Sequence, residues 1–396
     1  MKTKIIKSIL LSSLILPVLG CSNNADETTS TSTNNTYNVS IAVNNESLKN
    51  VIKSLIDNYS SSLDYNLNVT YLVDVESNSI SSIPDLFLTY DGLADKLAKQ
   101  GLIEEISETY VSKIETRDNA SALEAFKKTN KLNLFPLNYH FGEYLYYDSS
   151  IYDEDDVLDF ASLITKKEDK KINISNLSGA ELFGLFHGNG YDTDFIYDVE
   201  GNLASINDNI TEGSDNAIMV SNLFNNQGLS TDFYNPSSSY SAIIGGYYQY
   251  QDMKLYFDDN LKMAPLPDYT YDSKTYHWSN SIHSQGIAIT RSADNNKKEV
   301  LFDLALYLSS KDGQERINQI LSNNPLLPYP VVSTNKELHN EVEDINQIHM
   351  AKDFTYFPYE WSMISMNLFT RLINKNYDDV NDVLTDYHNS LSSLID

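Results

Sequence analysis

The sequence predicts an α/β protein with two domains, preceded by a short export signal. Segments with strand-like and helix-like patterns alternate from Tyr37 onward, as they do in β-α-β units. Residues 37–396 are enough for two domains of ordinary size. Cys21 is the only cysteine, so disulfides cannot hold the fold and a full hydrophobic core must do so.

The chain begins with the pattern of an export signal. Three lysines precede the apolar stretch 9–19, which is too short to span a bilayer as a stable helix. Gly20 lies directly before Cys21 and offers the narrow side chain that a signal peptidase needs. We therefore expect residues 1–20 to be a signal peptide.

The single cysteine has its own interpretation. The stretch Val18–Cys21 resembles the lipobox of bacterial lipoproteins, which implies that the Cys21 thiol is lipidated. An ordinary secretory signal with a leftover cysteine is the alternative, but an unpaired exported thiol would be a reactive liability. A diacylated cysteine is a stable anchor without a transmembrane helix, so we expect a location on the membrane, facing outside. Residues 22–36 carry no large apolar side chain, and with Cys21 they predict a flexible tether over 21–36.

The charge of the chain excludes some partners. The formal net charge is −27, and removal of residues 1–20 would take away three lysines and no acid, which leaves −30. Nucleic acids and anionic lipid headgroups are bound by clustered basic surfaces, so neither is expected as a partner. A high net charge also limits self-association, and we expect a monomer.

The first elements follow from hydrophobic periodicity. The stretches 37–43 and 68–73 predict strands, and the segment between them predicts a helix. The helix has apolar residues on one face, at Leu48, Val51, Ile52, Leu55, Ile56 and Tyr59. A third strand over 85–89 leads into a helix that ends at Gly101, where a left-handed cap is wanted.

Polar residues follow two of these strands. In open α/β sheets, ligands bind at the edge formed by the carboxyl ends of parallel strands. The sequence therefore predicts a rim formed by Asn44, Asn45, Glu46, Tyr90 and Asp91.

Seven segments, taken in order, resemble the extracellular solute-binding proteins of carbohydrate ABC transporters, the maltose-binding-like family. The segment 84–107 has a Pro-Asp-apolar strand and a helix that ends in Gln-Gly-Leu, and 284–317 has Gly-apolar-Ala-Ile, a Lys-rich helix start and Ser-x-x-Gly-Gln. The other five are "LNLFPLNYHFGEYLYYDSSIYDEDDV", "YSAIIGGYYQY", "LKMAPLPDY", "LLPYPVV" and "FPYEWSMISMNLFTRLI". Together they cover nearly the whole chain after the tether.

The resemblance implies a two-lobed periplasmic-binding-protein-like fold of type II. Each lobe would be a mixed sheet flanked by helices, with a cleft between the lobes that closes by hinge motion on a small molecule. We expect one lobe from residues 37–141 and 284–332, and the other from 142–283 and 333–396. The implied partners are a small-molecule solute, most simply a carbohydrate such as an oligosaccharide, and the permease subunits of an ABC importer.

The resemblance also implies ligand-binding residues. Sugars require carboxylates and amides for their hydroxyls and aromatic rings for their C–H faces. The residues that match are Asn44, Asn45, Glu46, Tyr90, Asp91, Glu143, Tyr247, Tyr248 and Trp361, and Glu181 and Phe183 lie near another contacting segment. Packing in the core is the alternative for the tyrosines and for Trp361, and Trp278 is expected to be a packing or rim residue.

Catalysis, metals and cofactors are not expected. The chain lacks a Gly-x-Ser-x-Gly elbow, a phosphate-binding Gly-x-x-x-x-Gly-Lys loop and a His-Glu-x-x-His motif. The acidic stretch 152–159 lacks the glycine and the distal glutamate of a calcium loop, and predicts a solvated helix start. His277 and His283 are too few ligands for zinc.

Three alternatives stay open. The first is a binding protein of the same build for another solute, such as a peptide or a polyamine. The second is a surface adhesin that retains the fold, and the third is a secreted enzyme that acts on glycosides, since 55 acidic residues offer many carboxylate pairs.

Overall fold

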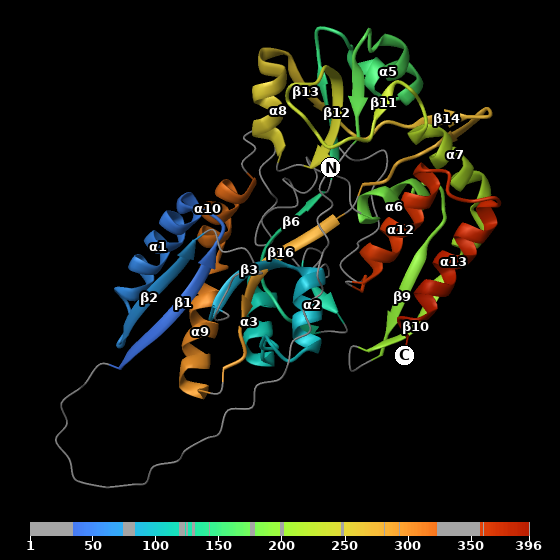
Figure 1. Ribbon diagram of the computed structural model, residues 1–396. Coiled ribbons are helices and arrows are strands. Elements are labelled where there is room, and N and C mark those ends of the chain that lie inside the picture. The colour runs from blue at the N-terminus through green and yellow to red at the C-terminus, as the bar shows by residue number, and fades with distance from the viewer. Residues whose placement is uncertain are drawn as a thin grey trace, which may run out of the picture. The chain divides into compact units, whose positions relative to one another are not determined.

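The protein consists of two lobes, each built around its own five-stranded sheet and its own hydrophobic core (Figure 1). This computed structural model describes residues 35–73, 84–118, 123, 126–128, 131–141, 143–174, 179–198, 202–246, 249–280, 282–292, 294–322, 357–358 and 360–395. Sheets flanked by helices confirm the predicted α/β class. The signal peptide, Cys21 and most of the tether lie outside the described residues.

The first lobe contains a mixed sheet with the strand order β2-β1-β3-β16-β6. Its strands are β1 (Thr36–Val43), β2 (Asn66–Val73), β3 (Leu86–Tyr90), β6 (Phe135–Phe141) and β16 (Ile282–Ile289). β1 pairs in parallel with β2 and β3, which confirms the predicted β-α-β start. β16 is antiparallel to both β3 and β6, so β6 runs in the direction of β3.

Among the described residues, five helices and a short hairpin accompany the first sheet. The helices are α1 (Glu46–Ser60), α2 (Asp91–Lys99), α3 (Glu108–Arg117), α9 (Asn295–Leu308) and α10 (Lys311–Ser322), and the hairpin pairs β4 (Lys127–Lys128) with β5 (Lys131–Leu132). The predicted apolar face of α1 is confirmed, because Leu48, Ile52, Leu55 and Ile56 are buried. Gly101 follows α2 with a φ of 67°, and its N–H donates to the carbonyl of Ala98 at 2.9 Å, so the predicted left-handed cap is also confirmed.

The second lobe contains a sheet with the strand order β11-β8-β12-β7-β13. Its strands are β7 (Glu143–Asp148), β8 (Lys171–Asn173), β11 (Leu229–Ser230), β12 (Tyr240–Gly246) and β13 (Leu261–Ala264). Two antiparallel pairs accompany it, β9 (Thr193–Tyr197) with β10 (Leu203–Asp208) and β14 (Tyr269–Tyr271) with β15 (Lys274–Tyr276).

Helices cover both faces of this second sheet. The main core of the lobe includes side chains from α5 (Phe160–Lys166), α6 (Gly179–His187), α7 (Ser214–Phe224), α12 (Trp361–Ile373) and α13 (Val380–Ser392). A smaller core lies under α8 (Tyr250–Phe257). Alternate side chains of β7 point to opposite faces of the sheet. Leu145 and Tyr147 are buried in the main core, and Tyr144 and Tyr146 are buried in the smaller core. The described part of this lobe also contains short 3₁₀ turns at η1 (Glu154–Val157), η2 (Ile210–Glu212) and η4 (Asp258–Asn260).

The chain crosses from the first sheet to the second and back, and the two crossings adjoin paired strands of the first sheet. It leaves the first sheet after β6, enters the second at β7, and returns to the first at β16, which pairs with β6. The last helices, α12 and α13, pack in the second lobe again. In the described part of the chain, no helix has both the length and the apolar character needed to cross a membrane.

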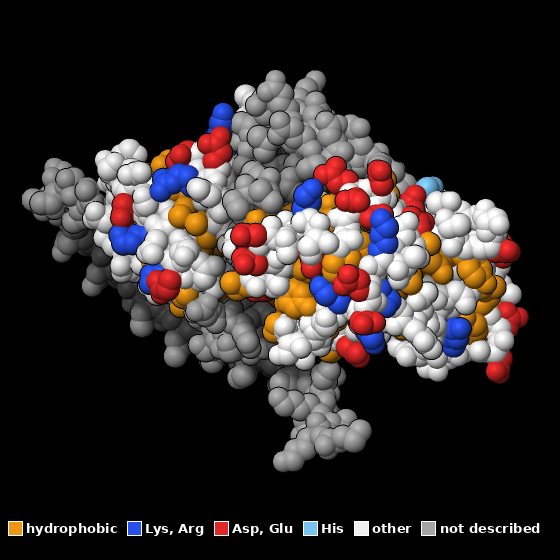
Figure 2. Space-filling model, turned by 90° about the horizontal axis from the view of Figure 1, so that it is seen from above, with side chains coloured by type: hydrophobic (Ala, Val, Ile, Leu, Met, Phe, Trp, Pro, Cys, Tyr) orange, Lys and Arg blue, Asp and Glu red, His pale blue; other side chains and the backbone are white. Residues whose placement is uncertain are grey.

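The charged side chains are dispersed over the surface. On the face shown in Figure 2, Lys and Arg lie among Asp and Glu side chains. Several charged side chains of the described residues form close ion pairs, such as Lys53 with Asp57 at 2.6 Å and Arg371 with Asp386 at 2.7 Å. The described residues on this face therefore do not form the clustered basic surface that nucleic acids require.

Candidate functional site

Two segments that the sequence places at a rim do meet at one edge of the first sheet. β1 and β3 are parallel neighbours, with Ile41 opposite Leu86, so Asn44 and Tyr90 follow strand ends at the same edge. The end of β6 and the start of β16 lie at this edge as well, because Ile282 pairs with Phe141. The chain thus enters the second lobe from the edge at which ligands bind in open α/β sheets.

The three polar residues after β1 have different local interactions. The Asn45 side chain caps α1, and its Oδ1 accepts a hydrogen bond from the Leu48 N–H at 2.8 Å. Glu46 lies in the first turn and forms an ion pair with Lys49 at 3.0 Å. Asn44, Asn45 and Glu46 are all exposed, and only Asn44 precedes the cap.

The residues after β3 present an aromatic ring. Tyr90 ends the strand opposite Gln285 of β16, and 43% of its surface is exposed. Asp91 is the first residue of α2, and its side chain lies outside the described residues. Tyr90 therefore offers a partly exposed ring at the predicted rim.

The second sheet has a matching edge at the start of β7. Glu143 begins β7 and pairs with Gly246, the last residue of β12, while β8 and β11 run parallel to β12. The ends of β8, β11 and β12 therefore lie on the same side as Glu143. The Asn280 side chain bonds to both backbone groups of Glu143: its Oδ1 accepts from the N–H at 2.8 Å, and its Nδ2 donates to the carbonyl at 2.5 Å.

The Glu143 side chain is a buried carboxyl group. Glu143 is 5% exposed, and the Oε2 atom of its side chain has no hydrogen-bond partner in the described structure. Burial raises the pKa of this carboxyl well above its usual value, and the negative charge of Glu181 makes a smaller contribution in the same direction. Glu181 lies in the first turn of α6, is partly exposed, and is near enough for its charge to act on the pKa of the Glu143 carboxyl.

Trp361 does not offer a surface for stacking. It is 2% exposed, and its ring packs against Phe357 at 4.1 Å and Phe183 at 5.2 Å between centroids. Its Nε1–H donates to the hydroxyl of Tyr387 at 2.8 Å. The structure thus places Trp361 and Phe183 in the core, in agreement with the packing alternative, because the apolar face of α12 is covered by α6 and α13. We leave both out of the site.

Trp278 is also a packing residue. It is 1% exposed, it stacks on Phe160 with centroids 6.2 Å apart, and its Nε1–H donates to the carbonyl of Glu181 at 2.9 Å. Tyr247 and Tyr248, the other two predicted aromatic contacts, lie outside the described residues.

An aromatic residue that the sequence analysis missed lies at the edge of the second sheet. Phe233 follows β11 and is 83% exposed. Its neighbours are anchored: the Asp232 carbonyl accepts from the Asn173 Nδ2 at 3.1 Å, and the Tyr234 ring contacts Tyr256 at 5.9 Å between centroids. Because both flanking residues are fixed, the Phe233 ring is held in solvent.

The acidic stretch 152–159 forms a helix start. The Asp153 N–H donates to Asp156 at 2.8 Å, and Asp156 forms an ion pair with Lys166 at 2.6 Å. Among the residues that the structure describes, no three His, Cys, Asp or Glu side chains come close enough to hold a metal ion. His277 pairs with Asp268 at 3.0 Å, and the side chain of His283 is not described.

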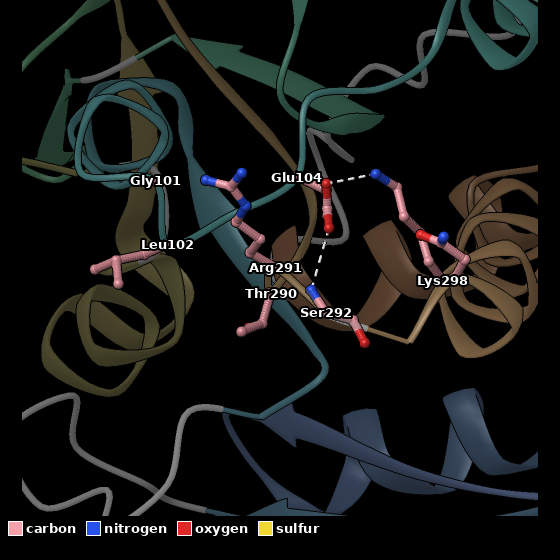
Figure 3. Close-up of a pocket in the computed structure, with 8 residues that line it drawn as sticks. Gly101, Leu102, Glu104, Thr290, Arg291, Ser292 and Lys298 are labelled. Atoms are coloured by element: carbon pink, nitrogen blue, oxygen red, sulfur yellow. Dashed lines mark hydrogen bonds and ion pairs between the residues drawn. The ribbon is translucent and has the colours of Figure 1, made fainter. Parts of the chain in front are cut away.

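A pocket of about 710 Å³ lies at the opposite edge of the first sheet (Figure 3). Glu104 lies at its centre and accepts from Lys298 Nζ at 2.7 Å and from the Ser292 N–H at 3.1 Å. The pocket adjoins the end of β16, which is antiparallel to β3 and so lies away from Tyr90. None of the predicted site residues lines it.

Comparisons with known proteins identify the fold. No family model and no curated protein matches the chain. Among solved structures, the maltodextrin-binding protein MalE1 from L. casei BL23 without ligand is similar with a TM-score of 0.68 and 15% identity, over 91% of this chain and 98% of that chain. The Thermus thermophilus maltotriose-binding protein with maltotriose has a TM-score of 0.64 and 14% identity, over 90% and 100% of the two chains.

A third similar structure is the GacH receptor of Streptomyces glaucescens GLA.O, described unliganded and in complex with acarbose. It matches with a TM-score of 0.67 and 14% identity, over 91% of this chain and 98% of that chain. The predicted resemblance is therefore confirmed at the level of the fold: the chain has the two-lobed α/β fold of the maltose-binding-like solute-binding proteins.

Proposed function

We propose that this chain, which has the fold of the maltose-binding-like proteins, is a carbohydrate-binding receptor of an ABC importer. The observation that carries the proposal is the likeness, over about nine-tenths of the chain, to three proteins whose names or complexes specify maltodextrin, maltotriose and acarbose. These are binding proteins rather than enzymes, and we propose binding without catalysis here.

The chemistry of the two sheet edges supports a sugar as the solute. Tyr90 and Phe233 supply exposed rings at the ends of β3 and β11, and aromatic rings pack against the C–H faces of sugars. Asn44 and Glu46 are exposed polar side chains after β1, and Glu181 is a partly exposed carboxylate on α6. The amide of Asn both donates and accepts the hydrogen bonds that ring hydroxyls need, and a carboxylate accepts them.

Asp91, Tyr247 and Tyr248 are part of the same proposal. Asp91 follows β3 directly, and the two tyrosines follow β12. In the sequence, all three thus come directly or within two residues after a strand that ends at one of the two edges.

The sequence at the N-terminus supports a membrane anchor. A lipidated Cys21 would hold the receptor outside the cell, and residues 22–36 are polar enough to act as a tether between the lipid and β1. We propose that the receptor delivers its solute from there to permease subunits in the membrane. Export, lipidation and delivery rest on the sequence pattern and on the resemblance.

The experiment that tests the proposal is a thermal-shift screen of the purified protein. The panel contains neutral mono- and oligosaccharides of the maltose series and other linkages, with peptides, polyamines and divalent metals for comparison. A ligand at a hundred times its dissociation constant adds about 2.7 kcal/mol to the free energy of unfolding, which raises the midpoint by several degrees. A shift confined to a sugar series supports the proposal.

Other results would replace the proposal. A shift with a peptide or polyamine alone would keep the receptor and overturn the carbohydrate. A cooperative melting curve that no member of the panel shifts would favour an adhesin that retains the fold.

A further inference from the structure

One row of side chains crosses the first sheet at the level where β3 ends. Gln285 of β16 pairs with Tyr90 of β3 on one side and with Asn138 of β6 on the other, and the three strands are neighbours in the sheet (Figure 1). Residues that pair directly in antiparallel strands point to the same face. Tyr90 is the last residue of β3, so this row lies at the predicted ligand-binding edge, and Gln285 is partly exposed.

Two buried amides connect Gln285 to helix α10. The Asn318 Nδ2 donates to the carbonyl of Leu137 at 3.0 Å, and the Asn138 Nδ2 donates to the Oδ1 of Asn318 at 2.8 Å. The same Asn138 Nδ2 donates to the Oε1 of Gln285 at 3.3 Å. Both asparagines are buried, at 0% and 1% exposure, so this series of amides is fixed within the protein.

The series sets the orientation of the Gln285 amide. A backbone carbonyl can only accept, so the Asn318 amide turns its Nδ2 toward Leu137 and its Oδ1 toward Asn138. Asn138 must then present its Nδ2 to Asn318, and the second hydrogen of that nitrogen is donated to Gln285. The Oε1 of Gln285 is thereby taken by Asn138, and the Nε2, with its two hydrogens, lies on the other side of the amide group.

This orientation has a cost, which indicates a role other than stability. The Oδ1 of Asn138 is buried without a hydrogen bond, and an unpaired buried polar atom lowers the free energy of unfolding. The reversed Asn138 amide would bring two acceptor oxygens together, so the unpaired atom follows from the series itself. Apolar side chains at these positions would pack without that cost. The buried unpaired oxygen therefore calls for a functional explanation.

We propose that Gln285 is a ligand-contacting residue of the first lobe, with Asn138 and Asn318 as the residues that position its amide. The inference rests on the proposed function and adds a residue to its binding site. In the described part of the chain, no group accepts a hydrogen bond from the Gln285 Nε2. This group donates to an acceptor oxygen of the sugar unit whose ring packs on Tyr90, because directly opposed side chains lie only about 4.5–5.5 Å apart at Cβ.

A fixed donor complements the acids of the proposed site. Ionised carboxylates, such as those of Glu46 and Glu181, accept hydrogen bonds and cannot donate them. A sugar hydroxyl that donates to a carboxylate keeps lone pairs that a donor satisfies. Because the amide of Gln285 is already held in one orientation, sugar binding does not have to immobilise it.

The test is titration calorimetry of the purified full chain with maltotriose and with every other sugar of the screening panel that raises the melting midpoint. Gln285→Met keeps the length of the side chain and removes the amide, and we expect roughly three- to tenfold weaker binding. Gln319→Met is the matched control, because Gln319 is an exposed residue of α10 next to Asn318. This control variant should bind sugar as the wild type does.

A double-variant cycle tests whether Asn138 positions Gln285. Asn138→Ala releases the Gln285 amide and should weaken sugar binding, though less than Gln285→Met does. If Asn138 acts through Gln285, adding Asn138→Ala to Gln285→Met causes no further loss of affinity. Asn318→Ala should behave in the same way, which keeps the test decisive if Asn138→Ala folds poorly. Additive losses of affinity in these cycles would overturn the positioning role.

Failure of the inference can be told apart from failure of the proposed function. A sugar that binds equally well to the wild type and to Gln285→Met would remove Gln285 from the site and keep the carbohydrate receptor. If no sugar of the panel binds to the wild type, the proposed function is overturned and the inference with it.

Discussion

The side-chain amide of Asn280 hydrogen-bonds to both backbone groups of Glu143, at 2.8 Å to the N–H and at 2.5 Å to the carbonyl. Glu143 is the first residue of β7, directly after the connection from β6, and Asn280 lies in the segment that leads into β16. The two connections are therefore fixed to each other by one buried side chain as well as by the pairing of Ile282 with Phe141.

Replacement of this amide should destabilise the protein. Asn280→Ala removes both hydrogen bonds and leaves two buried backbone groups unpaired, so we expect a loss of about 2–4 kcal/mol in the free energy of unfolding. Urea denaturation of the wild type and the variant measures this loss in the free energy of unfolding. Asn222→Ala is the matched control, because its amide bonds only to the Ile218 carbonyl within α7, and we expect a change below about 0.5 kcal/mol. Equal effects of the two variants would contradict the role of Asn280.

Loss of the Phe233 ring should weaken sugar binding and leave stability unchanged. Phe233→Ala removes an exposed ring at the edge of the second sheet, and we expect the binding free energy to fall by about 1–2 kcal/mol. Titration calorimetry with the sugar found in the screen measures the change. Leu255→Ala, a residue of α8 that is 85% exposed, controls for the loss of an exposed apolar side chain and should bind normally. Wild-type affinity in Phe233→Ala would remove this residue from the site.

Trp361 should matter for stability. Trp361→Ala would leave a large cavity among Phe183, Phe357 and Tyr387, and we expect a cost of about 3–5 kcal/mol in the free energy of unfolding. Trp361→Phe keeps most of the apolar volume but loses the bond to Tyr387, so its cost should be smaller. Thermal or urea denaturation ranks the variants. A stable Trp361→Ala protein with impaired ligand binding would instead return this residue to the site.

The contribution of Glu143 to the stability of the protein should fall as the pH rises past the ordinary pKa of a glutamate. The pKa of Glu143 is raised in the folded protein above the ordinary value of a glutamate, so over this window the folded state holds a proton that the unfolded state has released. Between the unfolded and the folded pKa, the free energy of unfolding therefore decreases with rising pH, and above the folded pKa this contribution is flat.

Glu143→Gln measures this contribution. The variant has no group to titrate at this position, so its stability relative to the wild type should increase with pH through that window. Urea denaturation of both proteins from pH 4.5 upward provides the comparison. Parallel stability profiles would contradict the raised pKa.

The sequence predicted those parts of the fold that depend on local pattern. The spacing of Leu48, Ile52, Leu55 and Ile56 is enough to define the buried face of α1, and a glycine after α2 is enough to predict the left-handed cap at Gly101. The rule that polar residues gather at the carboxyl ends of parallel strands predicted that Asn44 and Tyr90 share an edge.

The remainder of the site depends on contacts between distant segments. Trp361 is in the core because α6 supplies Phe183 and α13 supplies Tyr387, and no local pattern around Trp361 indicates that packing. Phe233 was missed because β11 has only two residues, too few for an alternating pattern to mark the strand end. Glu143 is buried because it starts a strand whose two faces are covered by the cores that contain α6 and α8. This packing joins distant segments, so the local sequence around Glu143 does not indicate it.

The most direct test of the proposed binding site is a crystal structure of the protein with the sugar that the screen identifies. The account predicts a sugar ring in contact with Phe233 or Tyr90, with its polar groups directed at residues that follow β1, β3, β8 or β12. A sugar bound elsewhere, for example in the pocket around Glu104, would contradict the assignment of the site to these sheet edges.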